Sequence, residues 1–381
     1  MKRIKSSKII QKDAIISGYV YFDENGIFAV TDEELPFKEE YDAGEMYVSP
    51  GFIDIHTHGG GGFAFEREIE DVIGGCNFHL AHGTTSICPT VSAAQFDSMA
   101  RSVNNIAATM RDERALPNVI GVHMEGPYLS LKQTGAQGAE FITPPNPEDY
   151  EKLISEYGDY IARWTYAPEN DENGEFCRHL VSSSIVPSAG HTDAIGSEMD
   201  AAAENGCRLI THLYSCTSTI TRDHGFRRLG VIETAYLNDD IFVEIIADGK
   251  HLPIDLIRLI YKIKGSDKIA LVTDSLALAG TDIKHGFMQS TEFIIEDGVC
   301  KLMDRSAFAG SIATADRLVR VITKEVGLPL TEAIKMMSST PARIMGLNKG
   351  AIEIGLDADI IIFDDDINVQ KIFVMGNEIP I

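Results

Sequence analysis

Short apolar runs recur along the middle of the chain and alternate with stretches that have helical spacing. Eight runs lie at 48–56, 85–89, 119–124, 161–166, 184–189, 209–213, 242–247 and 269–273. Near-continuous apolar runs are typical of parallel strands that are covered on both faces. Amphipathic helices are expected between them, for example at 71–82, 93–110 and 195–205. The pattern predicts an α/β fold built on a (β/α)8 TIM-like barrel, with a doubly wound open sheet as the alternative.

Both ends of the chain have the pattern of short strands and turns instead. Residues 14–26 are typical of a hairpin that turns at 23–26, and apolar strands are expected at 359–363 and 372–377. The simplest arrangement pairs the two ends. We therefore predict a small β-sandwich domain made of 1–49 and 347–381, with the barrel occupying 50–346.

Composition narrows the class of protein. The chain has 381 residues, of which 44% are hydrophobic, so it can form a packed core. It contains no run near the roughly 20 apolar residues of a membrane helix, and its basic N-terminus lacks a signal-peptide pattern, so we expect a cytoplasmic location. The formal net charge of −24 disfavours binding to nucleic acid or to an anionic membrane. The 6 cysteines are scattered without a Cys-x-x-Cys pair, so neither a disulfide framework nor a thiolate zinc cluster is predicted.

Polar residues that can bind a metal cluster where the apolar runs end. They are His56 and His58, Glu125, His191, His212 and Asp274. Side chains at i and i+2 of a strand point the same way, and the strand ends of a barrel share one face. We therefore expect all six side chains to meet at one mouth of the barrel. Imidazole and carboxylate ligands suit zinc or iron, as one ion or two.

Other polar or flexible positions near these ligands have simpler interpretations. His79 and His82 lie on an expected helix, and His123 is expected to pack or to form hydrogen bonds behind the ligands. The run at 59–62 contains four glycines, but it lacks the pattern of a phosphate-binding loop. A flexible loop after the first barrel strand is the better interpretation.

Several longer segments carry a family resemblance. They include Pro-Gly-Phe-Ile-Asp-Ile-His-Thr-His-Gly at 50–59, His-Met-Glu-Gly-Pro-Tyr at 123–128, Ala-Gly-His-Thr-Asp-Ala at 189–194, Ile-Ala-Asp-Gly-Lys-His at 246–251 and Leu-Val-Thr-Asp at 271–274. Through these segments, in this order and over nearly the whole chain, the sequence resembles the N-acetylglucosamine-6-phosphate deacetylase family of the amidohydrolase superfamily.

The resemblance implies a role for each matching residue. Glu125, His191 and His212 would bind one metal ion, and His56 and His58, with Glu125 bridging and Asp274 nearby, could bind a second. Asp274 would also act as general base and then general acid in hydrolysis of an N-acetyl amide. His251 would contact the substrate phosphate. Arg222 occupies the place of a phosphate-binding arginine that can reach across a dimer interface in the family, so a homodimer is expected. Phe308 precedes Ala-Gly-Ser at 309–311 and is a candidate for the acyl pocket.

The sequence departs from the family pattern in the substrate segments. Ser215 and Cys216 stand where the family has Asn-Ala, and the asparagine helps to hold the phosphate. Gln137 replaces a histidine that assists at the substrate carbonyl; it can donate a hydrogen bond but carries no charge. Three alternatives therefore stay open: a member that acts on another N-acyl amino sugar, an N-acyl amino acid or cyclic-amide hydrolase of the same superfamily, and an inactive structural homologue. The absence of a lysine at 165–169, where many cyclic-amide hydrolases carry a metal-bridging lysine, favours the deacetylase branch.

Overall fold

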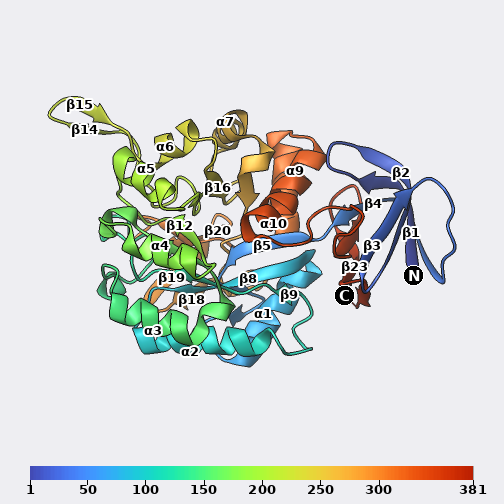
Figure 1. Ribbon diagram of the computed structural model, residues 1–381, viewed down its shortest axis with the longest axis horizontal. Helices are drawn as coiled ribbons and strands as arrows, with labels where there is room; N and C mark the ends of the chain where they lie inside the picture. The colour runs from blue at the N-terminus through green and yellow to red at the C-terminus, as the bar shows by residue number, and fades with distance from the viewer. Residues whose placement is uncertain (381) are drawn as a thin grey trace.

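The computed structural model describes residues 1–380 and contains a barrel of eight parallel strands (Figure 1). In chain order the strands are β5 (Phe52–Thr57), β8 (Thr84–Ser92), β10 (Val122–Glu125), β11 (Ile161–Tyr166), β12 (Val186–Ala189), β13 (Leu209–Ile210), β16 (Phe242–Ile245) and β17 (Ile269–Leu271). Each pairs with the next in this order, and the last returns to the first where the Asp274 amide donates to the His56 carbonyl at 2.9 Å. The predicted barrel is confirmed.

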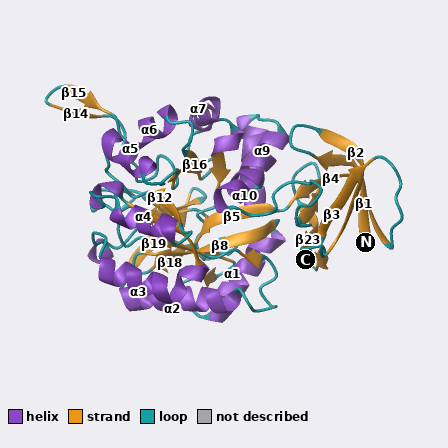
Figure 2. Cartoon of the chain, viewed as in Figure 1, coloured by secondary structure: helices purple, strands orange, loops and turns teal. Residues whose placement is uncertain are grey.

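Helices surround this barrel and cover its outer face (Figure 2). They are α1 (Ile69–Ala81), α2 (Phe96–Thr109), α3 (Pro147–Tyr157), α4 (Glu175–Ser182), α5 (Gly196–Glu204), α6 (Val231–Leu237), α7 (Ile254–Lys264), α8 (Ala315–Arg320), α9 (Leu330–Met337) and α10 (Ser339–Met345). In α2 the buried residues Met99, Val103 and Ile106 fall on one face, the spacing that makes a helix pack on a sheet. No helix among the described residues is long and apolar enough to cross a bilayer.

The two chain ends share one seven-stranded sheet beside the barrel, seen at the right of Figure 1. Its strands are β1 (Lys2–Ile10), β2 (Ile15–Asp23), β3 (Gly26–Thr31), β4 (Glu39–Pro50), β22 (Ile360–Phe363), β23 (Val369–Val374) and β24 (Asn377–Ile379). β4 joins the ends, because it pairs with β1 on one side and with β22 on the other. Alternate residues such as Ile4, Val20 and Ile360 form the core of this sheet domain. A small β domain built from both chain ends is confirmed, and the boundaries at 49 and 347 stay a prediction.

Two excursions from the barrel are not predicted by the hydrophobic pattern. An exposed hairpin of β14 (Thr221–Asp223) and β15 (Phe226–Arg228) projects from the molecule, at the upper left of Figure 1. A four-stranded sheet follows β17, made of β18 (His285–Met288), β19 (Thr291–Glu296), β20 (Val299–Leu302) and β21 (Phe308–Gly310). The strands of the hairpin are mostly polar, and the strands of the sheet are short and interrupted by polar residues, so neither has the apolar runs that mark the barrel strands.

The glycine run corrects one prediction. Instead of a flexible loop, it starts a tight hairpin between β6 (Gly59–Gly60) and β7 (Phe63–Ala64). Both glycines of β6 are buried, and a Cβ on Gly60 would lie 2.3 Å from a ring carbon of Phe78. Close packing therefore explains this glycine, and it holds the chain that leaves His58 in a defined path.

Candidate active site

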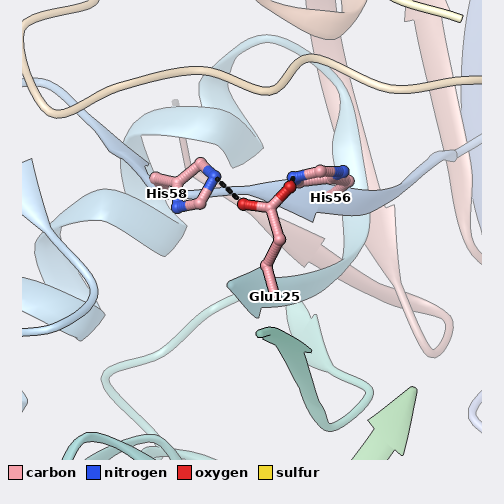
Figure 3. A group of neighbouring side chains, drawn as sticks. All are labelled: His56, His58 and Glu125. Carbon is pink, nitrogen blue, oxygen red and sulfur yellow. Dashed lines mark ion pairs between the residues drawn. The ribbon is translucent and has the colours of Figure 1, made fainter. Parts of the chain in front are cut away.

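The metal-binding candidates meet at the carboxyl ends of the barrel strands. His56 lies near the end of β5 and His58 directly follows the strand, and the two side chains point to the same side, as their i, i+2 spacing requires. Glu125 ends β10, and its carboxylate reaches between the two imidazoles (Figure 3). Its two oxygens lie 3.4 Å from His56 Nε2 and 3.3 Å from His58 Nε2. These three side chains form one group that could hold a metal ion.

A second group shares the same glutamate. Glu125 Oε1 lies 3.2 Å from His191 Nε2 and 3.0 Å from His212 Nε2, and the two nitrogens are 3.2 Å apart. Asp274 Oδ1 closes the first group, at 3.5 Å from His56 Nε2 and 3.2 Å from His58 Nε2. The structure thus brings together all six side chains that the sequence analysis placed at one mouth, with Glu125 between the two groups.

The donor atoms fit a divalent ion. A zinc–nitrogen bond is about 2.0–2.1 Å, so two ligand atoms of a tetrahedral site lie about 3.3 Å apart. The separations of 3.0 to 3.2 Å around His191, His212 and Glu125 are close to that value. His56 Nε2 is buried without a hydrogen-bond partner although it faces two carboxylates. Such a buried, unpaired lone pair is what a metal ligand requires.

Three of these residues adopt a left-handed backbone. The φ angles are +46° at His191, +30° at His212 and +47° at Asp274. Residues other than glycine rarely adopt this conformation, and it clusters at functional sites because surrounding structure must hold it in place. Here the backbone turns immediately after β12, β13 and β17, which aims each side chain across the barrel mouth.

The second ring nitrogen of most ligand histidines also has a partner. His58 Nδ1 lies 3.1 Å from Ser92 Oγ, and His191 Nδ1 lies 2.9 Å from the Gln133 carbonyl oxygen. His56 Nδ1 lies 3.4 Å from Glu244 Oε2. Such contacts fix the ring orientation and leave Nε2 for the metal.

The charges at the mouth favour a bound cation. Burial raises the pKa of the Glu125 carboxyl, but the imidazoles of His56, His191 and His212 outweigh burial and hold that pKa well below its usual range. Burial lowers the pKa of His56, but Glu125 and Asp274 outweigh burial and raise it to about 9. The carboxylates therefore attract positive charge at the imidazoles, and a divalent ion can supply that charge in place of protons.

A cavity of about 250 Å³ opens above the cluster. It is lined by most of the metal-binding candidates and by five of the six predicted substrate-binding residues: Gln137, Ser215, Cys216, His251 and Phe308. The imidazole of His251 faces Asp248 Oδ2 at 2.8 Å and packs edge-on against the Phe308 ring, with centroids 5.0 Å apart. Among the described residues that line the cavity there is neither lysine nor arginine.

Arg222 is the predicted substrate-binding residue that the structure leaves outside this cavity. It lies exposed on β14, in the projecting hairpin, and does not reach the metal cluster of its own chain. Its role as a substrate-binding residue that reaches across a dimer interface therefore stays a prediction.

Gln137 has a different contact from the one its position implied. Its amide nitrogen donates to Glu125 Oε2 at 2.8 Å, and its amide oxygen accepts from the Ala93 amide at 2.9 Å. The side chain is buried at the wall of the cavity and positions the shared carboxylate. Only the second N–H of the Gln137 side-chain amide is then left to donate a hydrogen bond to a substrate carbonyl.

The sequence analysis missed two charged residues beneath the cluster. Arg163 on β11 and Glu244 on β16 are both fully buried and form an ion pair. A signal existed, because each is a charged residue inside an otherwise apolar strand run. His123 lies where expected, between the hydroxyls of Thr90 at 3.1 Å and Thr165 at 2.7 Å.

A histidine and carboxylate cluster at the carboxyl rim of a (β/α)8 barrel defines a metal-dependent hydrolase site. The amidohydrolase family matches residues 47–379. The N-acetylglucosamine-6-phosphate deacetylase of Bacillus subtilis (strain 168) is 31% identical over 98% of this chain and 96% of its own length. The chain therefore belongs to the amidohydrolase family, in the branch of the N-acetylglucosamine-6-phosphate deacetylases.

Solved structures agree with this placement. The deacetylase of Pasteurella multocida is 28% identical, with a TM-score of 0.90 over 99% of both chains. A variant of the Mycobacterium smegmatis deacetylase, solved in complex with N-acetyl-D-glucosamine 6-phosphate, is 25% identical with a TM-score of 0.91 over 99% of this chain and 98% of its own. Amidohydrolases generally use divalent metals, and the His/Glu groups described above could hold them.

Proposed function

We propose that this protein hydrolyses the N-acetyl amide of N-acetylglucosamine 6-phosphate, or of a closely related N-acyl amino sugar, to acetate and the free amine. The observation that carries the proposal is the pair of ligand groups that share Glu125 beneath a cavity, with Asp274 beside both the imidazoles and the cavity. Relatives of this branch that match nearly the full chain carry that activity in their names.

Within this site we assign Glu125, His191 and His212 to one ion, and His56 and His58, with Glu125 bridging, to a second. Zinc and iron both suit these ligands. A bound divalent ion would supply a Lewis acid that polarises the acyl carbonyl and lowers the pKa of water to about 7. Metal content after reconstitution, measured by mass spectrometry, tests the identity and number of ions.

Asp274 is the proposed general base and then general acid. Its Oδ1 faces His58 Nε2 at 3.2 Å, and the side chain borders the cavity. Burial raises the pKa of this carboxyl, but His56 and His58 outweigh burial and hold it below its ordinary value. The carboxylate is therefore ionised at neutral pH, ready to accept a proton from the attacking water and to deliver it to the leaving amine.

A substrate phosphate would need positive charge that the cavity wall does not provide. His251 borders the cavity, and the described lining contains neither lysine nor arginine. We propose that the partner subunit's Arg222 supplies this charge in a homodimer, because β14 and β15 carry the residue away from the body of their own protomer (Figure 1). Light scattering would measure the oligomeric state, and Arg222→Ala should raise KM for the phosphorylated substrate more than it changes kcat.

A substrate comparison tests the proposed function. The metal-reconstituted protein would be assayed for acetate release from N-acetylglucosamine 6-phosphate, N-acetylglucosamine and N-acetylated amino acids. We expect the phosphorylated sugar to have the highest kcat/KM. Preference for an N-acetylated amino acid would contradict the assignment and favour the N-acyl amino acid hydrolase alternative. Failure to hydrolyse any of these substrates would favour an inactive homologue.

Ser215→Asn gives a sharper test of the phosphate assignment. Ser215 lines the cavity, and asparagine would restore an amide donor at that position. If a phosphate binds there, kcat/KM should rise for the phosphorylated sugar and stay unchanged for the sugar without phosphate. Phe308→Leu is the matched variant for the acyl end; it should change the preference among acyl groups and leave the phosphate preference unaltered.

The division into a β domain of 1–49 and 347–381 and a barrel of 50–346, and the cytoplasmic location, also stay predictions. Limited proteolysis and cell fractionation, respectively, would check them.

A further inference from the structure

A buried ion pair lies directly beneath the metal-binding groups. Arg163 and Glu244 project into the interior of the barrel, and neither side chain is exposed. The guanidinium also donates to the Ile55 carbonyl at 3.1 Å, to Ser188 Oγ at 3.0 Å and to Thr211 Oγ1 at 3.2 Å. Removing two charges from water is costly, so a pair inside an enclosed barrel calls for a reason beyond stability.

The free oxygen of this pair faces the metal ligands. Arg163 donates to Glu244 Oε1, so the other oxygen, Oε2, is free to face the barrel mouth. Glu244 Oε2 accepts from the His212 backbone amide at 3.3 Å and faces His56 Nδ1 at 3.4 Å. One carboxylate therefore touches a ligand of each group: the ring of His56 and the backbone of His212.

The His56 ring has a different kind of support from the other ligand rings. His58 and His191 contact a hydroxyl and a carbonyl oxygen, and His212 Nδ1 has no partner among the described residues. His56 alone among the four faces a carboxylate with its second nitrogen. A carboxylate behind a ligand imidazole fixes the tautomer with Nε2 free, and makes that nitrogen a better donor to metal.

We propose that Glu244, held in place by Arg163, is the positioning residue that makes the His56, His58 and Glu125 group a resident metal site, so that the protein carries two ions. The inference rests on the metal-dependent function proposed above. It adds that Glu244 acts on the ring of His56, whereas it contacts His212 only through the backbone amide and the His191 ring is oriented by the Gln133 carbonyl.

Glu244→Gln is the first test, because an amide has one acceptor oxygen. Arg163 would take that oxygen, and the amide NH2 would then face His56 Nδ1 and the His212 amide. We expect the affinity for the second ion to fall about 10- to 100-fold, the usual effect of losing such a support, while the first ion stays bound. Calorimetric titration of the apoprotein with Zn²⁺, and metal content after desalting, measure both sites. Ser188→Ala, which removes a partner of Arg163 but not of Glu244, should retain two ions.

Two double variants without either buried charge test the inference if Glu244→Gln alone does not fold. Arg163→Met with Glu244→Gln frees the amide oxygen to accept from His56, whereas Arg163→Met with Glu244→Met offers no acceptor. The first pair should bind the second ion about tenfold or more tightly than the second pair. Equal affinity in both pairs, or a single ion in the wild-type protein, would overturn the inference. Neither result depends on substrate turnover, so absence of deacetylase activity alone would contradict the proposed function and not this one.

Discussion

The two halves of the metal-binding cluster are built in different ways. His56 lies in β5 and His58 directly follows it, and their common direction follows from the alternation of side chains along a strand. His191 and His212 each lie two residues beyond the end of their strand, where the backbone is left-handed. The strand half has a carboxylate behind one ligand, whereas the half beyond the strand ends relies on backbone turns and a carbonyl oxygen.

This difference shows two routes to the same ligand geometry. A strand presents two ligands through periodicity alone, but it needs a partner behind each ring to select the tautomer. A left-handed turn aims a single ligand at a cost of about 1–3 kcal/mol in backbone strain, which the packed barrel must offset. A substitution in one half should therefore leave metal binding by the other half intact, so that the two can be measured separately.

The largest effect is expected at the residue that the halves share. Glu125→Gln removes the charge that both groups use and keeps the size of the side chain. We expect both ions to bind far more weakly and kcat to fall about a thousandfold or more, since a metal contributes several kcal/mol of transition-state stabilisation. Metal content and acetate release would be measured together. A variant that keeps both ions would show that the groups do not share this ligand.

The next comparison separates the halves. We expect His212→Asn to remove the ion of the Glu125, His191 and His212 group and to lower kcat about a hundredfold or more, whereas His56→Asn should remove the second ion and lower kcat by about tenfold. Both substitutions place an amide in a buried, polar site, so each controls for the other. The reverse order of effects would assign catalysis to the strand half.

Asp274→Asn addresses proton transfer rather than metal binding. We expect kcat to fall about 10²- to 10⁴-fold, the usual contribution of a positioned acid–base group. The ions should be retained, because Glu125 and four imidazoles remain. Loss of metal with activity would instead make Asp274 an essential ligand. A pH profile adds a check: in the wild-type protein the pKa of Asp274 is held below its ordinary value, so activity should not depend on this group near neutral pH.

The sequence predicted the strand half of the site and the barrel more completely than the rest. A continuous apolar run marked β17, and the His56/His58 spacing defined a direction before any tertiary contact was known. The left-handed turn at His212 depends on contacts with β16, including a 2.8 Å bond from the Leu213 amide to the Glu244 carbonyl, and local pattern does not contain these.

The contact of Gln137 with Glu125 could not be predicted from the local sequence pattern either, because it joins a loop to a strand 12 residues away through a side chain. The sheet of β18–β21 escaped for another reason: its strands are short and face solvent on one side, so they lack a strong apolar signal. Resemblance supplied the roles of Arg222 and His251, whereas the structure alone showed that the first lies outside its own cavity.

The smallest expected effect concerns the backbone that carries the strand half. His79 on α1 is fully buried, and its Nε2 lies 2.9 Å from the Gly59 carbonyl and 3.2 Å from Thr57 Oγ1, on either side of His58. Burial lowers the pKa of His79 from 6.5 to about 4, so the unfolded chain binds this proton more readily than the folded one. Stability from this group is therefore full above pH 6.5 and is lost as the pH falls toward 4.

Between pH 7 and pH 5 the loss from His79 should reach about 2 kcal/mol in the free energy of unfolding. His79→Gln keeps an N–H donor for the Gly59 carbonyl but cannot be protonated, so the variant should lose about 2 kcal/mol less than the wild type over this range. Urea unfolding at pH 7, 6 and 5 measures the difference, with both proteins in the same metal state so that the ligand histidines contribute equally. Parallel pH profiles would show that His79 does not remain neutral in the fold, and that the chain after His58 is held by other contacts.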